Sequence, residues 1–260
     1  MTKPVPAGVS GRFRERPVST GLRSSFAAVW VHEMPQHAAP PIVVAPDGTI
    51  DLQWIDGVLR IAGPDREAQT ETLPSGTTVI GFRFRPAAAA AWLGVPAHEL
   101  VDQRPALEDL WGAKARGLAD RIRAWQQDGA PIAALEAIVM DHTTDRPGDA
   151  AMAAAHALIA EGPPPGVPPV PWLGRSLGLS ERTLRRRFDE SFGYGPKTLD
   201  RILRYKRFEK LSQTAELPTA IAAVEAGYAD QAHLVRESKR LSGYTPKQTR
   251  RWRDALDPEA

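Results

Sequence analysis

Arginine side chains gather on a segment near the carboxyl end of the chain that has the pattern of a helix-turn-helix. This segment, 172–188, turns at Gly178 and opens its second helix with Ser180, whose hydroxyl can accept a hydrogen bond from a free backbone N–H. On that helix Leu184 and Phe188 lie four residues apart and can share a buried face. On or beside the opposite face lie Arg182, Thr183, Arg185 and Arg186. Because a guanidinium can donate to O6 and N7 of guanine at once, this face has the chemistry to read DNA bases.

The same plan occurs a second time about 50 residues later. Gly178 corresponds to Gly227 at an offset of 49, and Leu184 corresponds to Leu234 at an offset of 50, so the second turn is one residue longer. Two copies favour a single bilobed module over a repeat array.

One amphipathic helix is expected between the two units. Pro196 opens it, and its apolar stripe consists of Leu199, Ile202, Leu203 and Leu211. A helix of ~15 residues is ~22 Å long, which could set both second helices on one side of a duplex, in groove segments ~34 Å apart. Basic residues better placed for phosphates than for bases are Lys206, Arg207, Lys239 and Lys247.

Three motifs make residues 148–253 resemble the DNA-binding domain of the AraC/XylS family of bacterial transcription regulators. They are LSERTLRRRF at 179–188, GYADQAHL at 227–234 and GYTP at 243–246, in the family's order and spacing. The resemblance implies a seven-helix domain with reading helices at about 180–191 and 230–242, promoter DNA as ligand and RNA polymerase as partner. Carried over by position, the residues facing bases or nearby phosphates in the second helix are Gln231, Ala232, His233, Val235 and Arg236.

Two residues of the second unit depart from the family pattern. Ser238 stands where an aromatic residue is usual, and Ala222 stands where a larger aliphatic residue is usual. We therefore expect looser packing in the second unit.

Two alternatives compete with DNA recognition. Charge runs usually only solvate a helix surface, which is the simpler explanation of these arginines. The chain could also be a small-molecule binding protein or an enzyme whose carboxyl-terminal helices serve assembly. Charge favours DNA, since Lys and Arg outnumber Asp and Glu by 18 to 14 in residues 148–260, while acids prevail in 1–147.

The pattern before residue 148 changes from strands to helices. Short β-branched or aromatic runs between turn residues lie at 26–34, 42–45, 49–54, 58–62 and 77–84, and Asp56-Gly57 is a hairpin signal. Amphipathic helical stripes follow in 87–142. We expect an α+β protein. Residues 1–143 would form a small β-barrel or sandwich with a helical extension, and 148–260 the all-α domain. The resemblance implies a cupin-like sensor barrel and a homodimer made by the helical extension.

The proline-rich tract 162–171 looks like a linker between domains. We place the junction at 143–148 instead, because residues 150–160 have helical spacing and the family has a helix before its first helix-turn-helix. The tract then becomes a stiff internal loop.

Candidate ligand-binding residues lie on the predicted strands. Arg83 and Arg85 share one face by the period of two and could hold a carboxylate or phosphate of a small-molecule effector, with Asp51 as a neighbour. An internal ion pair between Arg and Asp is the more common use of such residues. Trp30 and Trp54 could line the same pocket, although a strand tryptophan is more often part of the core.

Several function classes find no support in the sequence. The chain has no cysteine, and its six histidines show no metal-binding spacing, so we expect no metal and no cofactor. Neither a glycine-rich phosphate loop nor a Gly-x-Ser-x-Gly motif occurs, and we expect no enzymatic activity. Since no long apolar run or signal-like amino terminus is visible, we expect a cytoplasmic protein without a membrane partner.

Overall fold

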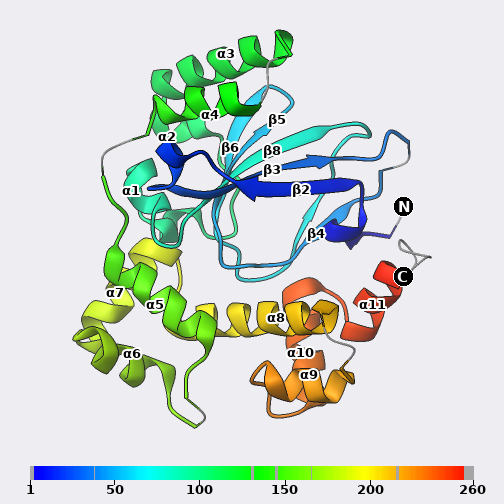
Figure 1. The fold of residues 1–260 in the computed structure, drawn as a ribbon, viewed down its shortest axis with the longest axis vertical. Helices are drawn as coiled ribbons and strands as arrows, with labels where there is room; N and C mark the ends of the chain where they lie inside the picture. The colour runs from blue at the N-terminus through cyan, green and yellow to red at the C-terminus, as the bar shows by residue number, and fades with distance from the viewer. Residues whose placement is uncertain are drawn as a thin grey trace.

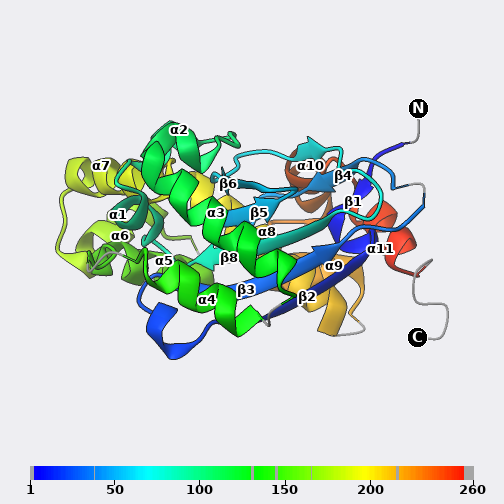
Figure 2. The same ribbon diagram turned by 90° about the horizontal axis from the view of Figure 1, so that it is seen from above.

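The computed structural model describes residues 3–37, 39–129, 132–143, 146–164, 166–214 and 217–254. Strands come first and helices follow, which confirms the expected α+β class. Figure 1 shows α3 and α4 on one side of a central sheet and α8 on the other, and Figure 2 gives the same layering from above. Within the described residues, none of the helices combines the length and apolar character needed to cross a bilayer.

The strands form two sheets. The larger has the order β2-β3-β8-β5-β6, with all pairs antiparallel. Its strands are β2 (Arg12–Pro17), β3 (Phe26–Glu33), β5 (Asp51–Ile55), β6 (Val58–Ala62) and β8 (Thr78–Phe84). The smaller sheet has the order β1-β4-β7, with β1 (Val5–Pro6), β4 (Ile42–Val44) and β7 (Gln69–Glu71). In the described part of the chain no ladder joins the two sheets, so the expected barrel is not closed and the sandwich alternative is correct.

Alternation along the strands gives the larger sheet two chemically different faces. Leu52 and Trp54 of β5 and Phe82 of β8 belong to a core shared with the helices above. Asp51 of β5 points to the opposite face and is paired in register with Arg83 of β8. The β5–β6 hairpin turns at Asp56-Gly57 as expected, with both residues at positive φ.

Short helices cover the apolar face of this sheet. They are α1 (Ala89–Leu93), α2 (Leu107–Trp111), α3 (Ala113–Gln127) and α4 (Ile132–Met140). Gly112, at φ 54°, separates α2 from α3, so the expected stripe is broken into two helices. Leu118, Ile122 and Leu135 are fully buried against the sheet. The apolar side chains of the helical extension therefore pack against the sheet of the same chain.

Seven helices follow in the described carboxyl-terminal part and build a second core. They are α5 (Ala150–Glu161), α6 (Pro169–Leu177), α7 (Glu181–Phe192), α8 (Pro196–Thr214), α9 (Thr219–Glu225), α10 (Gln231–Ser242) and α11 (Pro246–Asp254). The expected loop at 162–171 ends early, because α6 begins at Pro169 inside the proline tract. Proline is tolerated there since the first turn needs no N–H donor. The predicted junction 143–148 includes residues 144 and 145, which lie outside the described residues.

The strand-rich part and the carboxyl-terminal helices contact each other at both ends of α8. Near the first unit, an added Cβ on Gly193 would meet Val101 at 2.5 Å, so only glycine permits this close approach. Near the second unit, the Tyr244 hydroxyl donates to the carbonyl of Pro4 (2.6 Å), and Arg240 pairs with Glu67 (3.3 Å). Each helix-turn-helix unit is thus docked on the strand-rich part.

Gly81 of β8 offers a test of the packing between strands. A Cβ at this position would lie 2.1 Å from the Trp30 indole, so we expect Gly81→Ala to lower the free energy of unfolding by about 1–3 kcal/mol through overpacking. Urea denaturation measures the change. The matched control is Gly117→Ala in α3, where nothing lies within 4 Å and the added methyl should stabilise the helix by up to about 1 kcal/mol. Equal effects of the two substitutions would contradict the described packing of Trp30.

Candidate nucleic-acid interface and ligand pocket

The helix α7 presents arginines to solvent from a well-anchored position. The Ser180 hydroxyl accepts from the backbone N–H of Thr183 (3.2 Å), which confirms it as the N-cap. Leu184 and Phe188 are fully buried beneath the helix. The Arg185 and Arg186 side chains are 61% and 63% exposed. Among the described residues they pair only with glutamates of their own helix, Glu181 (3.7 Å) and Glu190 (2.7 Å). Exposed ion pairs of this kind contribute little free energy, so another anion, such as a phosphate, can replace the glutamate.

Arg182 is exposed beside these arginines, and Thr183 is half-buried. Arg187 faces the other way. It pairs with Asp149 and so ties α7 to the N-cap of α5, where the same carboxylate accepts from Ala151 and Met152. Burial would raise the pKa of Asp149, but the hydrogen bonds from Arg187 and from the backbone outweigh it and lower the pKa. Arg187 is thus a structural residue of the domain.

The helix α10 repeats the arrangement of α7. Asp230 caps it by accepting from the N–H of His233 (2.6 Å), and Leu234 and Leu241 are fully buried. The residues that were predicted to contact DNA are exposed or half-buried along its outer side: Gln231, Ala232, Arg236 and Lys239 are exposed, and His233 and Val235 are half-buried. The His233 ring stands edge-on to Tyr228 at 5.2 Å, so this ring is partly held inside the unit.

Ser238 shows how the second unit accommodates its departure from the family pattern. The side chain is fully buried, donates to the carbonyl of Tyr244 (2.7 Å) and lies 3.3 Å from the Tyr205 hydroxyl. Tyr205 of α8 is itself buried and supplies the aromatic ring at this place. The expected loose packing around Ser238 is not observed. The hydrogen-bonded side chains of Ser238 and Tyr205 together fill the space that one aromatic residue usually occupies in the family. Ala222 is also buried.

Two basic residues of α8 have surroundings that differ from the phosphate contacts we predicted. Arg207 donates to the carbonyls of Ile159 (2.7 Å) and Ala160 (3.0 Å) at the end of α5, so it holds the last turn of that helix. Lys206 pairs with Glu209 (2.7 Å) and lines a pocket below the sheets. Burial opposes the charge of Lys206, but Glu209 outweighs it and raises the pKa of the ammonium. Both predictions are corrected: Arg207 holds α5 to α8, and Lys206 faces the sheets. Lys247 is exposed on α11.

Comparison with protein families agrees with this geometry. Residues 173–251 match a family of helix-turn-helix domains. The carboxyl-terminal part of the chain is an AraC-type helix-turn-helix domain. In this domain α7 and α10 are the two predicted reading helices, and α8 connects them.

Other comparisons concern the rest of the chain. Residues 14–106 match a family described as a domain of unknown function. No curated protein sequence matches the chain. Solved structures of ToxT from Vibrio cholerae are similar at 11–12% identity. One covers 92% of this chain and 96% of its own, with a TM-score of 0.48. Another, bound to an unsaturated fatty acid, covers 93% and 97%, with a TM-score of 0.47.

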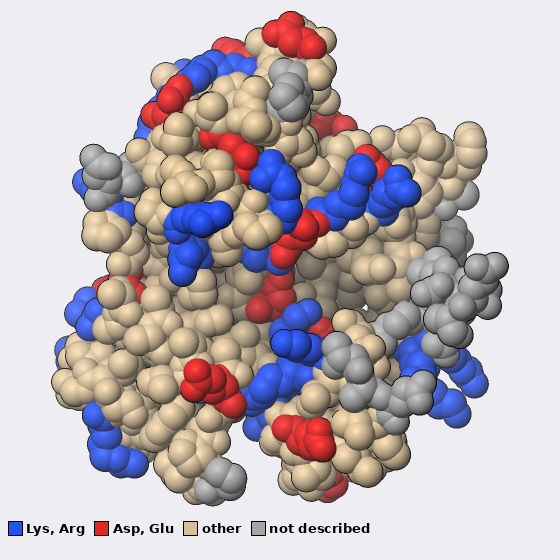
Figure 3. Space-filling view, viewed as in Figure 1, with Lys and Arg blue, Asp and Glu red and all other residues tan. Residues whose placement is uncertain are grey.

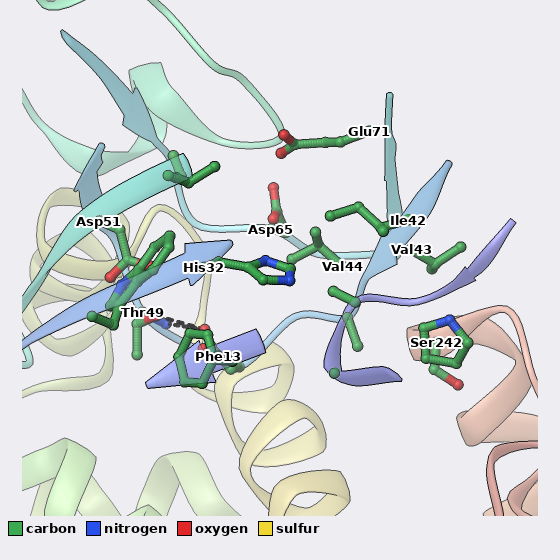
Figure 4. A pocket seen from close by; sticks show the side chains of 18 of the residues that line it. Phe13, His32, Ile42, Val43, Val44, Thr49, Asp51, Asp65, Glu71 and Ser242 are labelled. Carbon is green, nitrogen blue, oxygen red and sulfur yellow. Dashed lines mark hydrogen bonds between the residues drawn. The ribbon is translucent and has the colours of Figure 1, made fainter. Parts of the chain in front are cut away.

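A large pocket lies where the two sheets meet α8. Its volume is about 870 Å³, and residues of β3, β4, β5 and β8 line it together with Tyr205, Lys206 and Glu209 of α8. Figure 3 shows the molecule hollowed between the sheets and the helices, with acidic and basic side chains meeting across the hollow. Figure 4 shows His32, Asp51, Asp65 and Glu71 around the pocket, with Ser242 on its far side. A pocket of this size suits a small organic molecule.

The predicted ligand-binding residues separate into two groups. Trp30, Asp51 and Arg83 line the pocket. Trp54 lies on the other face of the sheet, where its indole N–H donates to Gln126 (3.0 Å), and it belongs to the core. Arg85 follows the end of β8 and donates to the carbonyl of Arg23 (3.5 Å). The predicted anion clamp of Arg83 and Arg85 is therefore corrected, because the two guanidinium groups do not converge.

Arg83 is used in an ion-pair cluster instead. It pairs with Glu15 (2.6 Å), Asp47 (3.4 Å) and Asp51 (3.4 Å), as the internal ion-pair alternative proposed. Burial raises the pKa of Asp51 to about 7, although the neighbouring Arg83 opposes this shift.

A second ion-pair cluster on the pocket wall was missed by the sequence analysis. Arg104 pairs with Asp65 (2.7 Å) and Glu71 (3.1 Å), while Arg60 pairs with Glu71 (2.5 Å) and donates to Gln53 (2.8 Å). Arg60 and Gln53 alternate with core residues on their strands, and this alternation could have placed both side chains on the pocket face from the sequence. Glu71 and Arg104 lie in segments with no such pattern, so only the fold brings them together.

The pKa of Asp51 makes a prediction about stability. Because the folded state binds a proton at Asp51 more tightly than the unfolded chain does, this group's contribution to stability falls as pH rises from about 4 to about 7. Asp51→Asn removes that dependence. Relative to the unmodified chain, the variant should therefore gain stability with rising pH, by at most about 1.4 kcal/mol per pH unit. Urea denaturation from about pH 5 to about pH 8 checks this. Parallel pH profiles of stability for the two chains would refute the raised pKa of Asp51.

Proposed function

We propose that this protein is a sequence-specific DNA-binding transcription regulator whose pocket takes a small-molecule effector. α7 and α10 enter the major groove of promoter DNA, and α8 sets their separation. The observation that carries the proposal is the exposure of Arg182, Arg185 and Arg186 on an N-capped helix whose opposite face is buried, within an AraC-type domain. Helix N-termini also favour approach to phosphates.

The roles of the individual residues follow from exposure and position. Arg182, Thr183, Arg185 and Arg186 of α7, with Gln231, Ala232, His233, Val235 and Arg236 of α10, face bases or adjacent phosphates. Ser180 holds the N-terminus of α7 in place, and Lys239 contacts phosphate from the exposed side of α10. Lys206 and Arg207 are not part of this interface.

The pocket supports the regulatory half of the proposal. It joins the strand-rich part to α8, so an occupant contacts the element that connects both reading helices. A ligand that binds one arrangement of these parts more tightly shifts the population toward it. RNA polymerase and a second copy of the chain are further partners in this proposal, which assigns the protein no catalytic step and places it in the cytoplasm.

Substitution of Arg186 tests base recognition. On a DNA site selected from a random pool, Arg186→Ala should weaken binding by about 1–3 kcal/mol and relax the preference at one base pair. Fluorescence anisotropy with the selected site and with single-base variants measures both effects. Arg121→Ala in α3 is the control, since that side chain is exposed and ion-paired far from the reading helices. A loss that is the same on random DNA would mean that Arg186 contacts phosphate only.

Salt dependence separates DNA recognition from the assembly alternative. Binding to the selected site should weaken with salt with a log–log slope near −0.9 per phosphate contacted, and Lys239→Ala should reduce the slope by about 1 while affecting all sequences alike. Titrations at several salt concentrations give the slope. Selection that yields no preferred sequence, together with binding that does not respond to salt, would favour a protein whose helices serve assembly.

A further inference from the structure

One carboxylate of the pocket has an oxygen that pairs with a guanidinium but accepts no hydrogen bond. Asp51 is 8% exposed and lines the pocket, and its Oδ1 makes no hydrogen bond to any described residue. The nearest cation, Arg83, lies 3.4 Å away at Nε, which is also without a hydrogen bond. A buried acceptor without a donor is costly, so its presence on a pocket wall indicates a place for a donor from a ligand.

Aromatic rings line the pocket beside this carboxylate. Trp30 lines the pocket, and the absence of a side chain at Gly81 lets its indole lie against β8. The Phe13 ring of β2 packs at 5.7 Å from Trp30 and at 6.1 Å from His32. Phe13 is 50% exposed although it is a large apolar residue, and it also lines the pocket. Aromatic faces attract organic cations, most strongly where the contact is shielded from water.

The charges of the lining residues favour a cation over an anion. Five carboxylates and four basic groups line this pocket in the described part of the chain: Asp47, Asp51, Asp65, Glu71 and Glu209 against Arg60, Arg83, Arg104 and Lys206. Each of the four basic groups has a carboxylate at 2.5–2.7 Å. An incoming anion would have to compete with these carboxylates, whereas an ammonium group favours the ionised form of Asp51 and pairs with it.

We infer that the pocket binds an organic amine, whose ammonium group donates to Asp51 and packs against Trp30 and Phe13. The amine carries an apolar body, because Val43, Leu73 and Val79 line the pocket beyond the carboxylate. This inference rests on the proposed function, in which the pocket takes the effector. At least one N–H is required, since Oδ1 of Asp51 accepts no hydrogen bond from the described residues and can take one from the ligand.

Three probes of similar shape and different charge test the inference. They are 4-phenylbutylamine, 4-phenylbutan-1-ol and 4-phenylbutyrate, each titrated into the full chain by calorimetry. The amine should bind at least about tenfold more tightly than the alcohol, and the carboxylate should bind most weakly. Asp51→Asn should remove the preference for the amine. Asp128→Asn, an exposed acid at the end of α3, is the control with the same change of charge.

A second variant keeps the test decisive if Asp51→Asn does not fold. Phe13→Leu changes a half-exposed ring that the core does not need, keeps an apolar surface, and should weaken the amine by about two- to fivefold through loss of the cation–π contact. The alcohol should be unaffected by this change. Tighter binding of the carboxylate than of the amine, or no binding of the amine at millimolar concentration, would overturn the inference.

DNA binding separates this inference from the proposed function. If the chain selects a DNA sequence but does not bind the amine, the ligand assignment fails while the regulator remains. If no DNA sequence is selected and the amine binds, the regulator fails while the assignment of the pocket remains.

Discussion

The arrangement of this protein depends on the burial of one face of α8. Leu199, Ile202 and Phe208 lie in the core of the carboxyl-terminal domain, where they contact elements of both helix-turn-helix units. Lys206 and Glu209 of the same helix face the pocket under the sheets. Because a helix is stiff over this length, the position of each reading helix and the floor of the pocket are set by a single element.

The second constraint is the alternation of side chains along β5 and β8. It sends Leu52, Trp54 and Phe82 into an apolar core and leaves Asp51 and Arg83 on the opposite face. The helices α3 and α4 of the strand-rich part pack on the other side of the sheet (Figures 1 and 2). A charged inner surface therefore remains over α8, and the pocket is its consequence.

The sequence predicted the features that rest on local pattern. The helices at 180–191 and 230–242, the cap at Ser180 and five strands agree with the structure within a few residues. β2 was missed, because Arg12–Pro17 is an exposed edge strand of charged residues without alternation. The direction of Lys206 was also missed. A ring of basic residues around an apolar stripe does not show which of them faces a neighbouring domain, and tertiary packing decides it.

The buried hydroxyl groups around Ser238 have a mechanical consequence. Tyr205 lines the pocket with part of its side chain, and its hydroxyl lies 3.3 Å from Ser238 on the inner side of α10. Ser238 donates in turn to the carbonyl of Tyr244, whose own hydroxyl reaches the first strand region at Pro4. The Tyr205 side chain thus lies between the pocket and the inner side of α10. In the proposed function, a ligand that moves Tyr205 acts on α10 through this contact.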